Sequence, residues 1–291
     1  MSGKLYLVGT PIGNLGDFSP RAAKMLSEAD FIAAEDTRVT LRLLNHLGIK
    51  KPLVSYHEHN RHSSGPKILE RLLAGDSCAL CSDAGMPCIS DPGQELVRLC
   101  GENGVEVIVI PGPTAAMSAL ALSGMETGRF TFEGFLSAKK GSREKRLTSL
   151  QNEERAMIFY EAPHKLIYTL RDMLRVFGDR KIALCREITK IHEEVIRTTL
   201  SQAAARCENA PPRGEYVLII EGASPPPPCE KISQEEAVAL VRSLCGQGYS
   251  LSEAAKLAAK ESGYKKGELY KLAVGLSFGK REKQVHLFEK T

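Results

Sequence analysis

Short apolar runs alternate with helical patterns along the first 125 residues. Each run is rich in apolar or β-branched side chains and is bounded by Gly, Pro, Asp or Ser; the runs are 5–8, 31–35, 53–56, 77–81 and 105–110. Such runs are typical of strands buried in a parallel sheet. The intervals carry helix signals, such as an N-cap followed by a first-turn proline at Ser19 and Pro20, and a closing glycine at Gly48. The alternation predicts an α/β domain over residues 1–125.

A second α/β domain is expected over residues 126–224, and a helical domain over 229–291. The expected strands of the second domain are 130–135, 156–162, 181–187, 194–200 and 215–223. Only His192 and Glu193 separate the third of these from the fourth, which suggests a hairpin and therefore a mixed sheet. The run SPPPP at 224–228 predicts a stiff spacer. Beyond it, three helical stretches near 233–246, 251–262 and 265–276 resemble a helix-turn-helix unit.

The formal charge of +4 is concentrated at one end of the chain. From Tyr264 onward there are seven basic residues against three acidic ones, whereas the preceding 263 residues hold 32 of each. The basic residues of this end are Lys265, Lys266, Lys271, Lys280, Arg281, Lys283 and Lys290. The body is therefore neutral overall, and a polyanionic partner is better sought at this end and at a local basic stretch, 139–146.

Several classes of protein are disfavoured by composition. No apolar run approaches the roughly 20 residues that cross a bilayer, so we expect no membrane span. The first residues reach Gly and Pro too early for a signal-peptide core. Eight cysteines in a chain of this kind indicate reduced thiols in the cytoplasm. Cys78 and Cys81 form a CxxC without a second pair, so buried cysteines are favoured over zinc and no metal is predicted.

Three loops rich in Gly, Pro, Ser, Thr and Asp follow the first, fourth and fifth expected strands, at 9–16, 82–93 and 111–124. Because the carboxyl ends of parallel strands meet at one sheet edge, these loops predict a ligand pocket. The glycine spacing of the first loop does not match a dinucleotide fingerprint, and no phosphate-binding P-loop is present. The second loop holds no Lys or Arg. A cationic or zwitterionic adenosine-type ligand therefore suits the pocket better than a polyphosphate.

Eight segments together resemble the tetrapyrrole-methylase superfamily and, within it, the branch that methylates a cytidine 2′-hydroxyl of 16S ribosomal RNA. In order they are GTPIGNLGD, AAEDTR, SDAGMPCISDPG, PGPTAAMSALALSGM, FEGFLSAKKGSR, FYEAPHK, REITKIHEE and RGEYVLIIEG. The resemblance covers residues 4–223, and the C-terminal helices resemble the appended domain of many members less specifically. Two positions depart from the family pattern: Met86, where Thr is usual, and Thr114, where Ser is common.

The resemblance implies a homodimer that holds S-adenosylmethionine in a cleft between the two α/β domains. Its substrate would be 16S rRNA within the small ribosomal subunit. Matching the motifs position by position implies cofactor contacts at Asp83, Ala84, Gly85, Cys88, Thr114, Ala115, Tyr160 and Ile188.

Methyl transfer to a 2′-hydroxyl needs the oxygen held close to the methyl carbon and its proton removed. We assign Lys190 and Glu187 as the catalytic candidates; His192, Glu35 and Asp36 are further candidates for the base. Lys190 would serve as a base if a closed cleft depressed its pKa. Equally, Lys190 and Arg186 would suit phosphate binding. For Glu35 and Asp36, an ion-pair network with Arg38 is favoured over direct catalysis.

RNA contacts are expected at Lys139, Lys140, Arg143, Arg186, Lys265 and Lys266, with the stretch 139–146 at the mouth of the cleft. Phe132, Phe135 and Phe159 are expected in the core rather than as stacking platforms, and His164 is expected to cap its helix. The terminal helices would grip RNA or stabilise the dimer; the sequence does not separate these.

The sequence disfavours two other functions. A small-molecule tetrapyrrole methylase is disfavoured because GTPIGNL replaces that branch's Gly-x-Gly-Pro-Gly loop and because the C-terminal end is basic. A non-catalytic nucleic-acid-binding regulator is disfavoured because the cofactor loops are intact.

Overall fold

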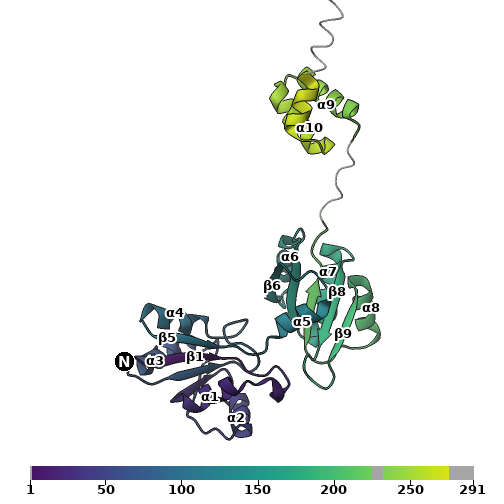
Figure 1. The fold of residues 1–291 in the computed structure, drawn as a ribbon. Helices are drawn as coiled ribbons and strands as arrows, with labels where there is room; N and C mark the ends of the chain where they lie inside the picture. The colour runs from purple at the N-terminus through teal and green to yellow at the C-terminus, as the bar shows by residue number, and fades with distance from the viewer. Residues whose placement is uncertain (1, 225–231, 275–291) are drawn as a thin grey trace, which may run out of the picture. The chain divides into compact units, whose positions relative to one another are not determined.

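The computed structural model describes residues 2–224 and 232–274 (Figure 1). It divides into two compact units, Met1–Ala223 and Ser224–Thr291, and each is described by itself. The proline run at 225–228, Cys229 and the four last basic residues of the C-terminal end (Lys280, Arg281, Lys283 and Lys290) lie outside the described residues.

The first half of the larger unit is built on a five-stranded parallel sheet in the order β3-β2-β4-β1-β5. Its strands are β1 (Lys4–Val8), β2 (Phe31–Ala34), β3 (Leu53–Ser55), β4 (Cys78–Cys81) and β5 (Glu106–Ile110). The helices between them are η1 (Leu15–Asp17), α1 (Pro20–Glu28), α2 (Thr37–His46), α3 (Arg61–Leu73) and α4 (Gln94–Glu102). The α/β architecture predicted from the alternation is confirmed, with every expected strand present.

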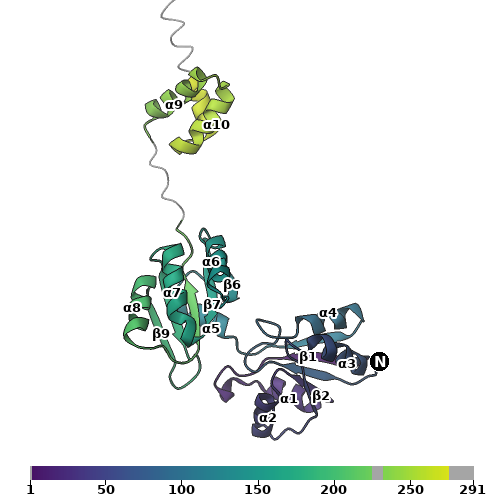
Figure 2. The ribbon, with the colours of Figure 1, turned by 180° about the vertical axis from the view of Figure 1, so that it is seen from behind.

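Helices cover both faces of this sheet, and the side chains of each strand alternate between two cores. Leu72 of α3 and Cys100 of α4 pack against one face, whereas Leu26 of α1 and Leu44 of α2 pack against the other. Figures 1 and 2 show the two helix pairs on opposite sides of the strands. Local signals set the helix ends: the Ser19 hydroxyl accepts a hydrogen bond from the Ala22 N–H at 3.1 Å, directly before Pro20.

A mixed sheet in the order β6-β7-β10-β8-β9 forms the second half of the larger unit. Its strands are β6 (Phe130–Phe135), β7 (Ala156–Glu161), β8 (Lys181–Arg186), β9 (Glu194–Thr199) and β10 (Tyr216–Ile220). Only β6 and β7 are parallel, and β8 and β9 form the predicted hairpin. One face carries α6 (Lys140–Ser149), α7 (Pro163–Phe177) and α8 (Leu200–Asn209), and the other carries α5 (Ala115–Ser123).

The C-terminal unit contains α9 (Gln234–Gly246), α10 (Leu251–Ser262) and helical residues 266–274. Capping boxes at Ser233 and Ser250 begin its first two helices. It has its own core, in which small side chains such as Ala254 and Ala258 let the helices approach Leu269 closely. Within the described part of the chain, no helix is both long and apolar enough to cross a bilayer.

Candidate active site

The neighbouring strands β1 and β4 lead into helices on opposite faces of the first sheet. In open α/β sheets, ligands bind at the carboxyl ends of two strands that diverge in this way. The backbones after the two strands are joined directly. Thr10 N–H donates to Gly85 O at 2.8 Å, and Gly85 N–H donates to Thr10 O at 3.1 Å. Two of the predicted ligand loops, 9–16 and 82–93, therefore meet at the carboxyl edge of the sheet.

Two glycines bring the third loop against the first. A Cβ on Gly112 would lie 2.8 Å from the Gly9 Cα, a distance that real Cβ atoms do not adopt, so the close approach of the loops requires glycine at both positions. The Met86 side chain fills the space beside them, with its Sδ 3.3 Å from the Gly112 N–H. Met86, the departure from the family pattern, is thus a packing element of the site.

A cavity of about 1030 Å³ opens at this edge and reaches residues of both sheets. This volume lies at the upper end of the roughly 300–1,000 Å³ range of small-molecule sites and is large enough for a nucleoside cofactor. Among its lining residues are nine of the ten residues predicted for the cofactor and for catalysis: Asp83, Ala84, Gly85, Thr114, Ala115, Tyr160, Glu187, Ile188 and Lys190.

Cys88, the tenth, does not line the cavity. Its Sγ lies in the space that a Cβ on Gly93 would occupy, 2.5 Å from that position, and the side chain packs against the core beneath the loop. Burial and the nearby Asp91 charge raise the pKa of the Cys88 thiol to about 11. The structure thus gives Cys88 a packing role where the sequence predicted a cofactor contact.

Cys78 and Cys81, the CxxC pair, also have packing roles. Cys78 and Cys81 are buried on opposite faces of β4, because residues three apart on a strand point to opposite sides. All seven cysteines among the described residues are free thiols, and that part of the chain holds no cluster of three or more His, Cys, Asp or Glu placed to bind a metal.

Aromatic side chains form one wall of the cavity. The Tyr160 ring packs edge-on against Phe132 and tilted against Phe135, with both centroids 5.3 Å away. Phe159 lies in the core, as predicted, and Phe132 packs against the core while it also lines the cavity; Phe135 is 58% exposed, so the expectation of a core residue is wrong for Phe135. His164 also lines the cavity at the start of α7 and makes no capping hydrogen bond.

Carboxylates gather on the side of the cavity formed by the first sheet. The Asp36 N–H donates to the Asp83 carboxylate at 3.0 Å, and the Asp83 N–H donates to the Glu35 carboxylate at 3.3 Å. Burial is the main cause that raises the pKa of Glu35 and of Asp83. Burial and the charge of Glu35 also raise the pKa of Asp91 to about 7.

Asp36 itself belongs to the predicted ion-pair network. Its carboxylate caps α2 by accepting the Arg38 N–H at 2.8 Å and pairs with the Arg38 guanidinium at 2.6 Å. These bonds lower the pKa of Asp36 to about 2. A carboxylate this acidic is a poor proton acceptor near neutral pH.

Lys190 closes the opposite side of the cavity. Its side chain packs over Gly13, and its ammonium lies 2.9 Å from the Glu215 carboxylate and 3.2 Å from that of Glu187. Burial lowers the pKa of Lys190, but the hydrogen bonds and charges of the two carboxylates raise it by more, so the net pKa lies above its ordinary value. The depressed pKa that a lysine base needs is therefore absent, and Lys190 is a charged cation here.

Glu187, the other catalytic candidate, is similarly engaged. It accepts the Glu215 N–H at 2.8 Å, which is the main cause that lowers its pKa, and it also holds Lys190. Glu187 thus positions a loop and a lysine; it is not poised to accept a proton.

Strained backbone borders the cavity. The described non-glycine residues in the left-handed region are Cys88, Ser90, Glu187 and Thr189, with φ between +50° and +72°. Such conformations cost roughly 1–3 kcal/mol each and cluster at functional sites. They occur here in only two loops, after β4 and after β8, and both loops contribute lining residues.

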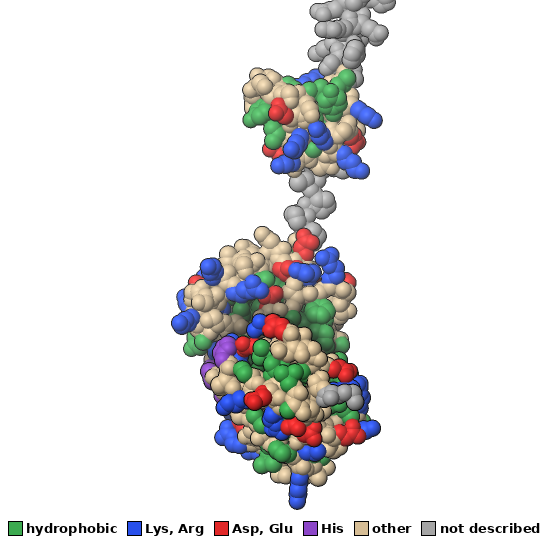
Figure 3. Space-filling view, turned by 90° about the vertical axis from the view of Figure 1, so that its left-hand side faces the viewer, with side chains coloured by type: hydrophobic (Ala, Val, Ile, Leu, Met, Phe, Trp, Pro, Cys, Tyr) green, Lys and Arg blue, Asp and Glu red, His purple; other side chains and the backbone are tan. Residues whose placement is uncertain are grey.

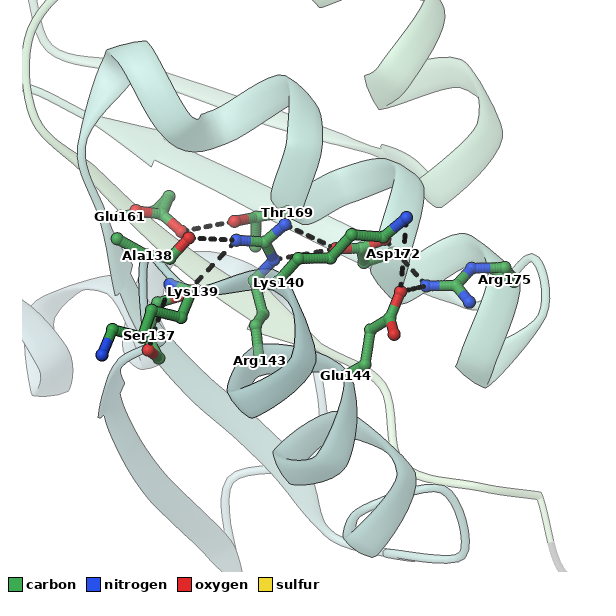
Figure 4. A network of polar contacts seen from close by, with 10 residues as sticks. All are labelled: Ser137, Ala138, Lys139, Lys140, Arg143, Glu144, Glu161, Thr169, Asp172 and Arg175. Carbon is green, nitrogen blue, oxygen red and sulfur yellow. Dashed lines mark hydrogen bonds and ion pairs between the residues drawn. The ribbon is translucent and has the colours of Figure 1, made fainter.

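The basic stretch 139–146 does not line the cavity, contrary to its expected place at the mouth. Figure 4 shows Arg143 turned inward to Asp172 of α7, with an Nη2–Oδ2 distance of 2.7 Å. Arg143 also donates to the carbonyls of Ser137 and Ala138 at 3.3 Å. Only 7% of Arg143 is exposed, so the predicted RNA contact is wrong for this residue: it anchors α6 and the loop before it.

The other predicted RNA-binding residues differ in their surroundings. Lys139 and Lys140 are exposed at the start of α6. Arg186 lies outside the cavity, donating to the Arg213 carbonyl at 2.8 Å and pairing with Glu194 at 3.4 Å. Lys265 and Lys266 are exposed on the C-terminal unit, on which Figure 3 shows several Lys and Arg side chains.

Several lining residues were not singled out from the sequence as site residues, among them Met117, Asp91, Glu161 and Glu215. Asp91 had a usable signal, since it lies in the loop after β4 that the strand pattern already assigned to a ligand. Glu215 had none, because its partner Lys190 lies 25 positions away.

The comparisons with known proteins first define a class. A family model described as Tetrapyrrole (Corrin/Porphyrin) Methylases matches residues 4–204. Uroporphyrin-III C-methyltransferase from Thermus thermophilus shares the fold, with a TM-score of 0.54, 19% identity and coverage of 75% of this chain and 94% of that one. Diphthine synthase superposes with a TM-score of 0.59 at 14% identity, covering 76% of this chain and 90% of that one. The chain is a tetrapyrrole-methylase fold protein.

Sequence relatives narrow the class. Ribosomal RNA small subunit methyltransferase I of Synechocystis sp. is 49% identical over 94% of this chain and 98% of the relative. The protein of the same name from Halalkalibacterium halodurans is 45% identical over 93% and 94%. A model described as RsmI C-terminal HTH domain matches residues 231–277. This chain belongs to the ribosomal RNA small subunit methyltransferase I family.

Proposed function

We propose that this protein transfers a methyl group from S-adenosylmethionine to the 2′-hydroxyl of a cytidine in 16S rRNA of the small ribosomal subunit. The observation that carries the proposal is the cavity of about 1030 Å³ at the carboxyl edge of β1, β4 and β5, in a chain of this family. The three loops expected to bind an adenosine-type ligand contribute to its lining. We propose further that the protein acts as a homodimer in the cytoplasm on the assembled subunit.

The lining residues fit this cofactor. When bound, S-adenosylmethionine supplies a methyl group activated by a positively charged sulfur. Ala84, Ala115 and Ile188 offer small apolar surfaces for an adenosine group, and Asp83 offers a carboxylate to an amino group or a hydroxyl. The lysine of the lining, Lys190, is compensated by two carboxylates, so it does not oppose a cationic ligand. A solved uroporphyrin-III C-methyltransferase of the same fold is complexed with S-adenosylhomocysteine.

Residues of this chain would also position the RNA. We assign Lys190 to orientation of the substrate, because its charged ammonium closes the cavity opposite the carboxylates of the first sheet. Lys139 and Lys140, exposed beside the second sheet, and Lys265 and Lys266 of the C-terminal unit are suited to phosphate contacts. A Thermotoga maritima relative aligns over 99% of its length but only 76% of this chain. A quarter of this chain therefore has no counterpart there, which suggests that part of the chain is accessory to methyl transfer.

Incorporation of label distinguishes this function from the alternatives. The protein is incubated with methyl-labelled S-adenosylmethionine and either small ribosomal subunits lacking the modification or a porphyrinogen. We expect label in 16S rRNA and none in the porphyrinogen; label in the porphyrinogen alone would refute the proposal. Absence of cofactor binding in calorimetry would favour a non-catalytic regulator.

A further inference from the structure

Six carboxylates line the cavity, and they differ in what binds them: Glu35, Asp83, Asp91, Glu161, Glu187 and Glu215. A carboxylate whose lone pairs are already occupied by N–H groups or cations is held in its ionised form and accepts a proton poorly. The residue that removes a substrate proton should therefore be the least engaged of the six.

On the side of the second sheet, the carboxylates are all bound. Glu161 is almost completely buried and accepts the Ala162 N–H at 2.9 Å and the Thr169 hydroxyl at 2.6 Å. Glu187 and Glu215 share Lys190, and Glu187 also accepts the Glu215 N–H.

On the side of the first sheet, Glu35 and Asp83 are bound by reciprocal backbone bonds. Each carboxylate accepts an N–H from the loop that carries the other: Asp83 N–H donates to Glu35, and Asp36 N–H donates to Asp83. These bonds tie the loop after β2 to the loop after β4.

Asp91 is the exception. Its carboxylate is half-buried, and among the described residues no backbone N–H or cation is bonded to it; the neighbouring Ser82 hydroxyl donates to the Gly85 carbonyl at 3.4 Å and the Ala84 carbonyl at 3.5 Å. Ser90 directly before it adopts a left-handed φ of +63°, and the Ser90 Oγ would lie 3.3 Å from a Cβ placed on Gly134 of β6. The loop therefore extends from the first sheet toward the second and brings Asp91 near β7. The negative charge of Asp91 is one of the causes that raise the pKa of Tyr160 on β7.

We propose that Asp91 is the general base that removes the proton from the ribose hydroxyl, an inference that rests on the proposed function. The hydroxyl proton passes to the Asp91 carboxylate as the 2′-oxygen forms its bond to the methyl carbon. The carbon–sulfur bond breaks, and its electron pair stays on sulfur, which becomes a neutral thioether. Asp91 then releases the proton to water, and no other reactant is needed.

The groups that face Asp91 tune it for this task. Glu35 and Asp83 after β2 and β4 add negative charge, Cys88 lies in the same loop and Tyr160 faces it from β7. Burial and the neighbouring carboxylates raise the pKa of Asp91 to about 7, against an ordinary value near 3.8. A general base is most effective when its pKa lies near the working pH.

The test compares Asp91→Asn with wild type in single-turnover methylation of small subunits from pH 5.5 to 9. The wild-type rate should rise through about pH 7 and level off, because only the ionised carboxylate accepts a proton. Asp91→Asn should lower the plateau about 100-fold or more and remove the rise. Asp91→Glu should restore part of the methylation rate, and that rate should again rise with pH. Asp17→Asn, exposed and outside the lining, is the matched control and should behave as wild type.

Melting temperature provides a readout independent of turnover. The pKa of Asp91 is higher in the folded protein than in the unfolded chain, so ionisation of Asp91 destabilises the fold at pH values above the ordinary carboxyl pKa. At pH 8, Asp91→Asn should therefore melt no lower than wild type. The melting temperature of Asp91→Asn relative to that of wild type should rise between about pH 4 and about pH 7. An Asp91→Asn rate within threefold of wild type that still rises with pH overturns the proposal, as does a lower melting temperature at pH 8. Wild type that methylates no subunit at any pH instead refutes the proposed function.

Discussion

Replacing Arg143 by methionine is expected to destabilise the larger unit by about 3 kcal/mol. The ion pair with Asp172 has both side chains about 10% exposed, and breaking a buried pair costs roughly 3–5 kcal/mol because one charge is left uncompensated. Asp172 keeps a second partner, Arg175, at 2.9 Å, which places the loss at the lower end of that range. The chain has no tryptophan, so urea unfolding of the full-length protein is best followed by circular dichroism.

The matched control is Arg171→Met, on α7. Arg171 pairs with Glu208 at 2.6 Å, but the two side chains are 55% and 48% exposed, so the loss should stay below about 1 kcal/mol. Folded Arg143→Met should bind small subunits with wild-type affinity. A loss of stability below about 1 kcal/mol, or a weaker salt dependence of RNA binding, would refute the structural assignment and return Arg143 to the RNA interface.

Three further predictions follow from the site and the C-terminal unit. Lys190→Gln should lower turnover on small subunits while leaving the midpoint of the pH–rate profile in place; loss of the pH-dependent limb would identify Lys190 as the base after all. Gly112→Ala should lower the free energy of unfolding by about 1–3 kcal/mol and weaken cofactor binding in calorimetry, because its Cβ would overlap Gly9; wild-type values would contradict the close approach. Removing residues 229–291 should weaken RNA binding and flatten its dependence on salt, since phosphate contacts release counterions; unchanged affinity would remove the C-terminal unit from the RNA interface.

The fold could be predicted closely because its signals are local. Each expected strand lies within a few residues of the observed one, since buried parallel strands are short apolar runs that any window reveals. The cap at Ser19 and the hairpin after β8 are set by neighbouring residues in the same way. The three loops that contribute to the cavity lining could be predicted because parallel strands place their carboxyl ends together, whatever the details of the side chains.

What could not be predicted depends on partners distant in sequence or on irregular backbone. The Arg143 ion pair joins residues 29 positions apart, and a basic run gives no sign of it. The charge state of Lys190 depends on Glu215, which belongs to another strand end.

At Phe135, a backbone irregularity breaks the usual alternation of strand side chains between the two faces of the sheet. Strand residues three apart ordinarily face opposite sides of a sheet. A bulge between Phe132 and Gly134 shifts the register of β6 by one residue, so that Phe132 pairs with Ile158 and Phe135 pairs with Tyr160. Both rings consequently face the same side, where they meet Tyr160 in the cavity wall.

The central claim is methylation of a cytidine 2′-hydroxyl, and the modified nucleoside tests it most directly. Small subunits lacking the modification are treated with the protein and S-adenosylmethionine, and 16S rRNA is digested to nucleosides for mass spectrometry. The account predicts new 2′-O-methylcytidine in wild-type reactions and little in Asp91→Asn reactions over the same time. A methyl group found on a base, or on no nucleoside of 16S rRNA, would contradict it.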